Sequence, residues 1–451
     1  MEKIEIEKIV KWCKGEINNK NFLPLYINGI STDTRKIKKG EIFIALKGEK
    51  FDGHQFVQEA YKNGAIGAIV DKNISFSSEK KFFIIRVKDT LKSLGDIAKE
   101  YRNYINPYII GITGSDGKTT TKELIAKCLT EKFNVRANHG NYNNQIGLPL
   151  SLLSFDKKTE IGVLEMGMSK KGELDYLSKI AKPDSCAITN IGRAHIGFFK
   201  NIKEIAESKS EILNNLKGEK FCLFNRDDNF FNFLKSRSSG NVKTFGKSRK
   251  ADVRGIIIDE GNDFFSFKVN NFNEKFIVNF WNTSMIYPSL ISIAFSIKFG
   301  IDFDKIKGII EKFNSIEGRG KVYKIKGVCL IDESYNSNPN SLKNSLICFS
   351  RKNFKRKIAI IGDMAELGKF SSFYHKYIGQ LIRKLDIDMV ITLGEKSKII
   401  SDINLGKHFS DIEKLNLFIK NKIKTGDGIL IKGSNFLNME EITKFLIKEI
   451  G

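Results

Sequence analysis

The sequence predicts a protein of the α/β class with three domains. Short runs of β-branched and aromatic residues alternate with amphipathic helical stretches, which is the pattern of α/β folds. The 451 residues also exceed what one ordinary hydrophobic core accommodates. Because the pattern breaks twice, we expect domains at 1–106, 107–313 and 314–451.

Local patterns justify the first elements. In the first domain, apolar runs predict strands at 41–48, 65–70 and 82–87. The segment "NYINPY" (103–108) interrupts the pattern, and the strand "YIIGIT" that follows leads into a glycine-rich loop and a helix from about Lys118. Apolar side chains on that helix fall on one face: Leu124, Ile125, Cys128 and Leu129.

The later strands each end at a glycine or a polar turn. In the middle segment they are expected at 161–167, 185–192 and 220–225. In the last segment they are expected at 328–334, 357–363, 389–394 and 428–434. Strand ends of parallel sheets are where α/β folds bind ligands, so we expect function at these ends.

Composition and charge exclude several classes of protein. The six cysteines include no Cys-x-x-Cys pair, which argues against a zinc site or a disulfide framework and fits a reducing cytoplasm. The first residues carry alternating charges, and the longest apolar stretch (285–301) contains Pro288 and Lys298, so we expect no signal peptide and no membrane span.

The net charge of +23 raises the question of nucleic-acid binding. The lysines are spread evenly and accompany many Asn, Ile and Phe residues, so we attribute the charge to compositional drift. We expect no nucleic-acid partner. A basic surface would also suit an anionic, nucleotide-linked substrate.

The segment "TGSDGKTT" (113–120) is typical of a phosphate-binding loop, although the leading glycine of the usual consensus is replaced by Ile112. The glycines let the backbone wrap around phosphate, and the amides at a helix N-terminus point at the anion. Lys118 would reach the terminal phosphates, and the Thr119 hydroxyl would bind Mg²⁺. The alternative is a plain glycine-rich turn. The expected nucleotide-binding residues are Thr113, Gly114, Ser115, Asp116, Gly117, Lys118, Thr119 and Thr120.

The shortened register Thr-Gly-x-x-Gly-Lys-Thr resembles that of the Mur ligase superfamily, which includes the folylpolyglutamate synthases. Four further stretches follow in the order of that superfamily: 140–153, 165–177, 188–199 and 205–213. The resemblance implies a small N-terminal α/β UDP-binding domain, a central P-loop ATPase-like parallel-sheet domain and a C-terminal Rossmann-like α/β domain.

Three further residues matter for metal binding. From the residues alone, Glu165 could be a solvated strand-end carboxylate, His195 a satisfied loop histidine and Lys209 a surface lysine. The resemblance implies that all three are catalytic: Glu165 as a Mg²⁺ ligand, His195 as a ligand of a second Mg²⁺, and Lys209, carbamylated by CO₂, as a further Mg²⁺ ligand. Thr119 completes the metal-binding set. It also implies an ATP contact for Asn144 and substrate contacts for two other residues, Asn141 and Asn143.

The N-terminal stretch 30–70 resembles the UDP-binding domain of the MurE and MurF ligases, which folylpolyglutamate synthases lack. The alternative is a small α/β domain of unknown role. The resemblance implies a set of residues that face the UDP-sugar: Ser31, Asp33, Thr34, Arg35, Lys47, Asp52, Gly53 and His54.

The C-terminal segment resembles the MurF group more than the MurE group. The stretches "IDESYNSNPNSL" (331–342) and "IGDMAELG" (361–368) resemble MurF signatures, and the Asp-Asn-Pro-Arg motif of MurE enzymes is absent. Substrate binding is implied for Asn338. The residues implied to contact ATP are Arg319, Asp332, Glu333, Tyr335 and Asn336.

The chain also departs from the superfamily. A polar run that usually contributes to adenine binding is replaced by Ser284, Met285 and Pro288, and Asn435 stands where MurF proteins usually show arginine. The acidic pair before the Tyr-Asn motif is Asp332-Glu333 instead of two aspartates.

The resemblance implies an ATP- and Mg²⁺-dependent amide ligase of peptidoglycan precursor synthesis. It would join D-alanyl-D-alanine to UDP-N-acetylmuramoyl-tripeptide through an acyl phosphate, as a cytoplasmic monomer. Two alternatives stay open. One is a MurE-type ligase that adds a single amino acid, and the other is a non-catalytic nucleotide-binding paralogue, which the altered 282–288 segment would suit.

Overall fold

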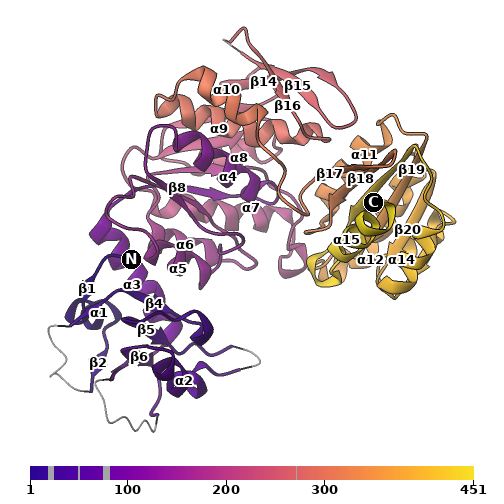
Figure 1. The fold of residues 1–451 in the computed structure, drawn as a ribbon. Coiled ribbons are helices and arrows are strands. Elements are labelled where there is room, and N and C mark those ends of the chain that lie inside the picture. Colours follow the sequence, from indigo (N-terminus) through magenta and orange to yellow (C-terminus); the bar gives the residue numbers. More distant parts are fainter. Residues whose placement is uncertain (19–24, 49–50, 75–81, 271) are drawn as a thin grey trace.

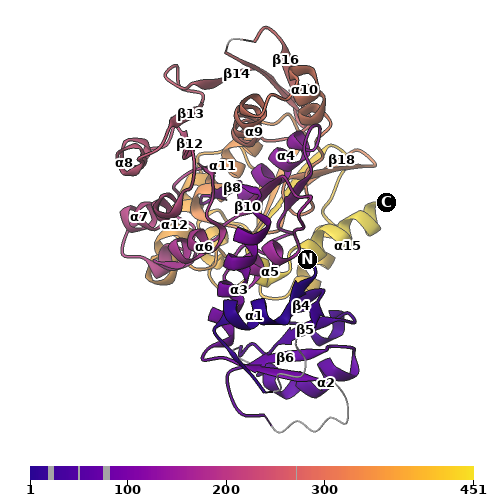
Figure 2. The same cartoon turned by 90° about the vertical axis from the view of Figure 1, so that its left-hand side faces the viewer.

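The fold consists of three α/β domains in chain order, as a computed structural model shows (Figure 1). The structure describes residues 1–18, 25–48, 51–74, 82–270 and 272–451. In Figure 1 the N-terminal domain lies below the central domain, and the C-terminal domain lies to one side of the central domain. In the perpendicular view of Figure 2, the C-terminal domain lies behind the central domain. The three-domain α/β class expected from the sequence is confirmed.

The N-terminal domain is built on a mostly parallel sheet of strand order β2-β7-β6-β5-β4, in which β2 runs antiparallel to β7. Its strands are β1 (Ile4–Glu5), β2 (Glu16–Ile17), β3 (Tyr26–Ile27), β4 (Gly29–Ser31), β5 (Glu41–Ile44), β6 (Gly67–Val70) and β7 (Phe83–Arg86). Its helices are α1 (Ile6–Cys13), η2 (Thr34–Lys36), η3 (Gly53–Phe56), α2 (Val57–Lys62) and α3 (Thr90–Ile105).

Helix α3 joins the N-terminal domain to the central one, because one of its faces packs against two helices of the central domain. Tyr101, fully buried, donates its hydroxyl to the carbonyl oxygen of Phe155 at 2.7 Å. Arg102 is also fully buried; its guanidinium donates to the carbonyl oxygen of Ala181 at 2.8 Å and pairs with Asp184 at 3.2 Å. A buried cation with these partners fixes the helix in one position.

The central domain contains a sheet of strand order β16-β15-β14-β13-β12-β11-β8-β10-β9. The expected parallel arrangement holds from β9 to β14, but β15 and β16 extend the sheet antiparallel. Its strands are β8 (Tyr108–Thr113), β9 (Val135–Ala137), β10 (Ile161–Glu165), β11 (Ser185–Ile188), β12 (Phe221–Asn225), β13 (Val242–Gly246), β14 (Val253–Glu260), β15 (Phe265–Val269) and β16 (Lys275–Val278). Its helices are α4 (Lys118–Leu129), α5 (Gly147–Leu153), α6 (Glu173–Ala181), η4 (Ile196–Phe198), α7 (Ile202–Ser210), η5 (Glu211–Asn215), α8 (Phe231–Arg237), η6 (Thr283–Met285), α9 (Ile286–Lys298) and α10 (Phe303–Glu311).

Helix α4 buries the face that the sequence predicts. Its members Leu124, Ile125, Cys128 and Leu129 are fully buried between the sheet and helix α9. Helix α9 is apolar on nearly all of its faces because it lies inside the core of the domain. This explains the length of the apolar stretch at 285–301. Among the described residues, no helix combines the length and the apolar composition that crossing a membrane requires.

The C-terminal domain has strand order β17-β18-β22-β19-β20-β21, parallel except for β17. Its strands are β17 (Lys321–Ile325), β18 (Val328–Glu333), β19 (Arg356–Gly362), β20 (Met389–Leu393), β21 (Lys407–Phe409) and β22 (Asp427–Lys432). Its helices are α11 (Pro339–Ser350), η7 (Gly368–Phe370), α12 (Ser371–Ile382), α13 (Lys398–Ile403), α14 (Ile412–Lys420), η8 (Asn435–Leu437) and α15 (Glu440–Ile450).

The turn between β14 and β15 contacts the C-terminal domain. Lys352, buried, pairs with Glu260 at 2.8 Å, and the exposed Lys324 pairs with Asp263 at 2.5 Å. The antiparallel extension, which the sequence pattern did not indicate, therefore forms part of the joint between the two domains.

Candidate functional site

The phosphate-binding loop lies where the sequence predicts it, between β8 and α4. Gly114 has a φ of +148°, and a Cβ at this position would lie 1.9 Å from the hydroxyl oxygen of Thr189. Gly117 has a φ of +77° and begins the helix as its N-cap. Ile112 is instead a fully buried residue inside β8, paired with both neighbouring strands. The loop thus needs glycine at 114 and 117, and not at 112.

Two lysines converge on this loop. The ammonium of Lys118 donates to the carbonyl oxygen of Gly114 at 3.0 Å, and that of Lys209, on α7, donates to the same oxygen at 3.0 Å. Lys118 lines a cavity, whereas Lys209 is buried and does not line it. Burial, followed by repulsion from Lys118, lowers the pKa of Lys209 well below the usual range of a lysine.

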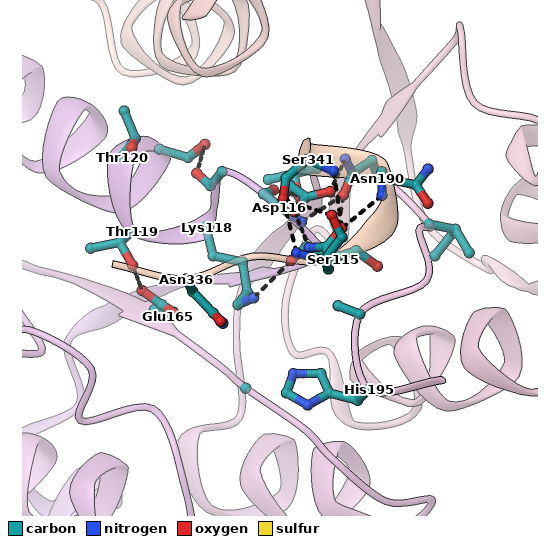
Figure 3. Close-up of a pocket in the computed structure, with 18 of the residues that line it drawn as sticks. Ser115, Asp116, Lys118, Thr119, Thr120, Glu165, Asn190, His195, Asn336 and Ser341 are labelled. Atoms are coloured by element: carbon teal, nitrogen blue, oxygen red, sulfur yellow. Dashed lines mark hydrogen bonds between the residues drawn. The ribbon is translucent and has the colours of Figure 1, made fainter. Parts of the chain in front are cut away.

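A carboxylate lies directly beside the loop. Thr119 donates its hydroxyl to Glu165 Oε2 at 2.7 Å (Figure 3). Asn143 donates its amide to Glu165 Oε1 at 2.7 Å. Asn138 exchanges hydrogen bonds of 2.9 Å with the backbone of Glu165. These described partners are neutral, so none of them is a cation that forms an ion pair with this buried carboxylate.

His195 approaches the cavity from the opposite side (Figure 3). It has a φ of +61°, and its Nδ1 lies 2.6 Å from Oε2 of Glu366, which also has a positive φ. The imidazole lowers the pKa of the Glu366 carboxyl. The amide of Gly197 donates to the carbonyl oxygen of Glu366 at 2.8 Å, so the central domain contacts the C-terminal domain here.

The phosphate loop is held by a residue that no sequence motif indicated. Asn190, directly after β11, accepts the amides of Ser115 and Asp116 at 3.0 and 2.9 Å through Oδ1. The hydroxyl of Thr189 donates to the carbonyl oxygen of Asp116 at 2.6 Å. The signal that could have identified both residues is their position as the first polar side chains after a buried strand.

A cavity of about 1420 Å³ brings most of the expected site residues together between the central and C-terminal domains. Those that line it are Ser115, Asp116, Gly117, Lys118, Thr119, Thr120, Asn141, Asn143, Asn144, Glu165, His195, Arg319, Glu333, Tyr335, Asn336 and Asn338. The expected site residues that do not line the cavity are Thr113, Gly114, Lys209, Asp332 and the N-terminal residues expected to face the UDP-sugar.

The C-terminal side of the cavity is preorganised by its own contacts. The guanidinium of Arg319 lies 3.7 Å from the ring centroid of Tyr335. Asp332 does not line the cavity, and its carboxylate accepts the amides of Gly318 and Ser334 at 3.2 and 3.1 Å. It therefore supports the turn that carries Arg319.

Glu333 has a different neighbour set from that of Asp332. Its carboxylate pairs with Lys432 at 3.0 Å and accepts the hydroxyl of Ser345. Lys432, a further residue that no sequence motif indicated, lies at the end of β22 and lines the cavity. Neutralisation by this lysine lets a carboxylate stay in a site for anions.

The altered adenine segment lines the same cavity. Ser284, Met285 and Pro288 all contribute to its wall, next to Tyr287, which donates its hydroxyl to Asp227 at 3.1 Å. Asn435 is exposed and lies outside this cavity. The segment therefore lines the cavity even though its residue types differ from those usual in the superfamily.

The N-terminal candidates form a separate group in the first domain. Asp33 pairs with Arg35 at 2.9 Å and accepts its amide, while Thr34 donates to Glu59 at 2.7 Å. Ser31 accepts the amide of Asp33. The arginine is exposed, so its ion pair can exchange for a ligand at small cost.

The second N-terminal stretch folds around a buried histidine. Nδ1 of His54 lies 2.6 Å from Asp52, and its Nε2 accepts the amide of Asp71 at 3.2 Å. Lys72 and then His54 lower the pKa of Asp52. The backbones of Lys47 and Asp52 form an isolated antiparallel β-bridge, and Gly53 begins the following turn. Residues 49–50 lie outside the described part of the chain.

The residue types in the expected metal-binding set limit how a metal ion could be held. Among the residues that the structure describes, no group of three or more His, Cys, Asp and Glu side chains is placed to hold a metal ion. The expected set holds only Glu165 and His195 of these types, since the others are a hydroxyl and a lysine.

Comparison with known proteins identifies the family. The family models described as Mur ligase family catalytic domain, Mur ligase middle domain and Mur ligase glutamate ligase domain match residues 26–102, 112–294 and 318–435. The UDP-N-acetylmuramoyl-tripeptide--D-alanyl-D-alanine ligase of Bacillus subtilis is 34% identical over 99% of both chains, and that of Synechocystis is 33% identical over 94% of this chain and 92% of its own.

Solved structures agree with the sequence relatives. MurF from Acinetobacter baumannii superposes with a TM-score of 0.92 at 27% identity over 99% of both chains. MurF ligase from Thermotoga maritima in complex with ADP gives a TM-score of 0.83 at 29% identity over 94% of this chain and 97% of its own. The chain belongs to the Mur ligase family, and within it to the group of UDP-N-acetylmuramoyl-tripeptide--D-alanyl-D-alanine ligases, the MurF ligases.

Proposed function

We propose that this chain is an ATP-dependent ligase that joins D-alanyl-D-alanine to UDP-N-acetylmuramoyl-tripeptide in peptidoglycan precursor synthesis. The names of its relatives give the two substrates. The observation that carries the proposal is the phosphate loop, whose Lys118 and Thr119 face a cavity completed by the C-terminal domain. The reacting groups would thus meet between two domains.

The chemistry follows from the poor reactivity of a carboxylate. An oxygen of the tripeptide's terminal carboxylate attacks the γ-phosphorus of ATP, and the bond from that phosphorus to the β–γ bridging oxygen breaks, releasing ADP. The amine of the dipeptide then attacks the acyl phosphate, loses a proton and expels phosphate. Lys118 would offset the charge on the transferring phosphoryl group, and Arg319 would approach it from the C-terminal domain.

The residues present fit Mg²⁺. A buried carboxylate with neutral partners, Glu165, lies beside the hydroxyl of Thr119, and His195 lines the same cavity. We assign Glu165 and Thr119 as groups that would hold one Mg²⁺, and His195, on the opposite side of the cavity, as a ligand of a second Mg²⁺. Bound Mg²⁺ supplies positive charge that stabilises the phosphate oxygens.

A carbamate on Lys209 also fits the structure. An ammonium that is fully buried 3.0 Å from a carbonyl oxygen already used by Lys118 is unfavourable. Addition of CO₂ to the neutral amine gives an anion that would act as a further ligand for a hard cation. Lys209 would thereby become the fourth member of the metal-binding set.

Each of the three expected domains would have its own role. Residues 1–106 would bind the UDP-sugar through the Asp33 and His54 turns, residues 107–313 would bind ATP, and residues 314–451 would close the site. Enclosure protects the acyl phosphate from water. The enzyme would act as a monomer, since two domains of a single chain line the cavity. Its free cysteines fit the reducing cytoplasm.

The proposal is tested by measuring phosphate release with ATP, UDP-N-acetylmuramoyl-tripeptide and D-alanyl-D-alanine, with mass spectrometry of the product. Dipeptide-dependent release with a UDP-pentapeptide product is expected. Release with a single amino acid would instead indicate a MurE-type ligase, and ATP binding without turnover would indicate a non-catalytic paralogue. Tripeptides carrying diaminopimelate or lysine at the third position identify the preferred acceptor.

A further inference from the structure

The C-terminal domain contacts the phosphate loop through one side-chain hydrogen bond. Asn338 Nδ2 donates to Asp116 Oδ1 at 2.6 Å, joining residues 222 positions apart in the chain. Asp116 is the loop residue directly before Gly117 and Lys118. We infer that this hydrogen bond is how the C-terminal domain positions the phosphate loop, so that Asn338 and Asp116 are positioning residues instead of substrate- and ATP-binding groups; this inference rests on the proposed function.

Both ends of the Asn338 amide are occupied. Its Oδ1 accepts the amides of Asn340 and Ser341, each at 3.0 Å, as the N-cap of helix α11. Ser341 completes a capping box by accepting the amide of Asn338 at 3.2 Å. The cap therefore fixes the orientation of the side chain, and its NH₂ group is directed at Asp116. A residue held in this way is poorly suited to bind a substrate.

Asp116 is unusual for a phosphate loop because a carboxylate repels phosphate. Both carboxylate oxygens have amide donors, because Oδ1 accepts from Asn338 and Oδ2 accepts from Asn190 at 3.4 Å. The helix that Asn338 caps has twelve residues, and the positive end of its dipole favours the carboxylate. The negative charge is therefore stabilised by the C-terminal domain.

The contact can control the loop because Asp116 is also fixed through its backbone. Its amide donates to Asn190 and its carbonyl oxygen accepts from Thr189. Docking of α11 thus acts on a residue whose neighbours, Gly117 and Lys118, face the cavity. Separation of the domains would leave the Asp116 carboxylate without its amide donor and free to repel the incoming phosphates.

The pair allows a reciprocal exchange. In Asn338→Asp, the new carboxylate still caps α11, because aspartate is as good an N-cap as asparagine, but it faces Asp116 as a like charge. In Asp116→Asn, a neutral amide can still accept from Asn338. In the double variant, the amide introduced at position 116 can donate to the carboxylate introduced at position 338, so the hydrogen bond returns with its direction reversed. Asp411→Asn, which exchanges the exposed N-cap of α14, is the matched control.

The experiment measures kcat and KM for ATP in the full-length enzyme, together with the melting temperature. We expect kcat/KM for ATP to fall roughly ten- to a hundredfold in Asn338→Asp. The double variant should return to within about threefold of wild type, and the melting temperatures should match that of Asp411→Asn. A double variant as impaired as Asn338→Asp, or an unimpaired Asn338→Asp, would overturn the inference. Absence of ligase turnover in wild type would instead contradict the proposed function.

Discussion

Lys118 and Lys209 donate to the same acceptor, the carbonyl oxygen of Gly114, each across 3.0 Å. Lys118 lines the cavity, but Lys209 is buried and is not among the residues that line it. An ammonium without a carboxylate partner is unfavourable at such a position. The geometry therefore leads directly to a prediction about the chemical state of Lys209.

We predict that Lys209 carries a carbamate. Enzyme equilibrated with ¹³C-labelled bicarbonate should show a carbamate resonance in its ¹³C NMR spectrum, because the buried amine is readily neutral. Lys209→Arg should lose both this resonance and most of the ligase activity, since arginine does not form a carbamate under these conditions. Lys122 is a second buried lysine that donates to a backbone carbonyl oxygen, that of Asn138, so it serves as the comparison for Lys209 within the same protein. A resonance that persists in Lys209→Arg would contradict the assignment.

Removal of the cavity-facing lysine should abolish turnover. Lys118→Ala removes the cation that offsets charge on the transferring phosphoryl group, and we expect kcat to fall at least about a hundredfold. Lys127→Ala, an exposed position on the same helix, should keep near wild-type kcat. Steady-state phosphate release measures both variants, and full activity of Lys118→Ala would remove the phosphate loop from the mechanism.

The charge of Glu165 should set the requirement for Mg²⁺. Glu165→Gln keeps the size of the side chain beside Thr119 and Asn143 but removes its negative charge. The Mg²⁺ concentration for half-maximal activity should rise at least about tenfold. The control is Glu160→Gln, an exposed carboxylate that accepts the amide of Asn134. An unchanged Mg²⁺ titration would show that Glu165 is not a metal ligand.

Gly114 should not tolerate a side chain. In Gly114→Ala, the new methyl group would meet the Thr189 hydroxyl at 1.9 Å with a φ of +148°, so we expect a loss of at least about 2 kcal/mol in the free energy of unfolding. Gly308→Ala is the counterpart, because its Cβ meets no heavy atom within 4 Å on helix α10. It should gain about 0.5–1 kcal/mol. Urea unfolding followed by circular dichroism measures both.

Much of the fold could be predicted because its strands are short, apolar and bounded by turns. The strand expected at 108–113 and the helix from Lys118 match β8 and α4 at their bounds. The strands β14 to β16 were not predicted, since polar residues such as Asp259 and Lys268 interrupt their apolar pattern. These strands lie near the edge of the sheet, where one face stays exposed and tolerates such residues.

The site was predictable only where a motif carries the chemistry. The spacing of Gly114, Gly117 and Lys118 reflects a local backbone requirement, so it is visible in the sequence. Lys432 and Asn190 depend on contacts between distant segments, which no local pattern records. The same limit applies to Asp332: the resemblance implies a contact to ATP, which stays a prediction, and its support of the turn at Gly318 became visible only in the structure.

The two joints of the molecule differ in their dependence on ionic strength. Arg102 and Asp184 meet in a buried setting, where dissolved ions screen the attraction weakly. Lys324 and Asp263, beside the β14–β15 turn, are exposed, so salt screens their attraction strongly. Rising salt therefore weakens the attraction between Lys324 and Asp263, whereas the neighbouring pair of Lys352 and Glu260, whose lysine is buried, is screened less. Dissolved salt thus acts unevenly on the contacts that hold the three domains together.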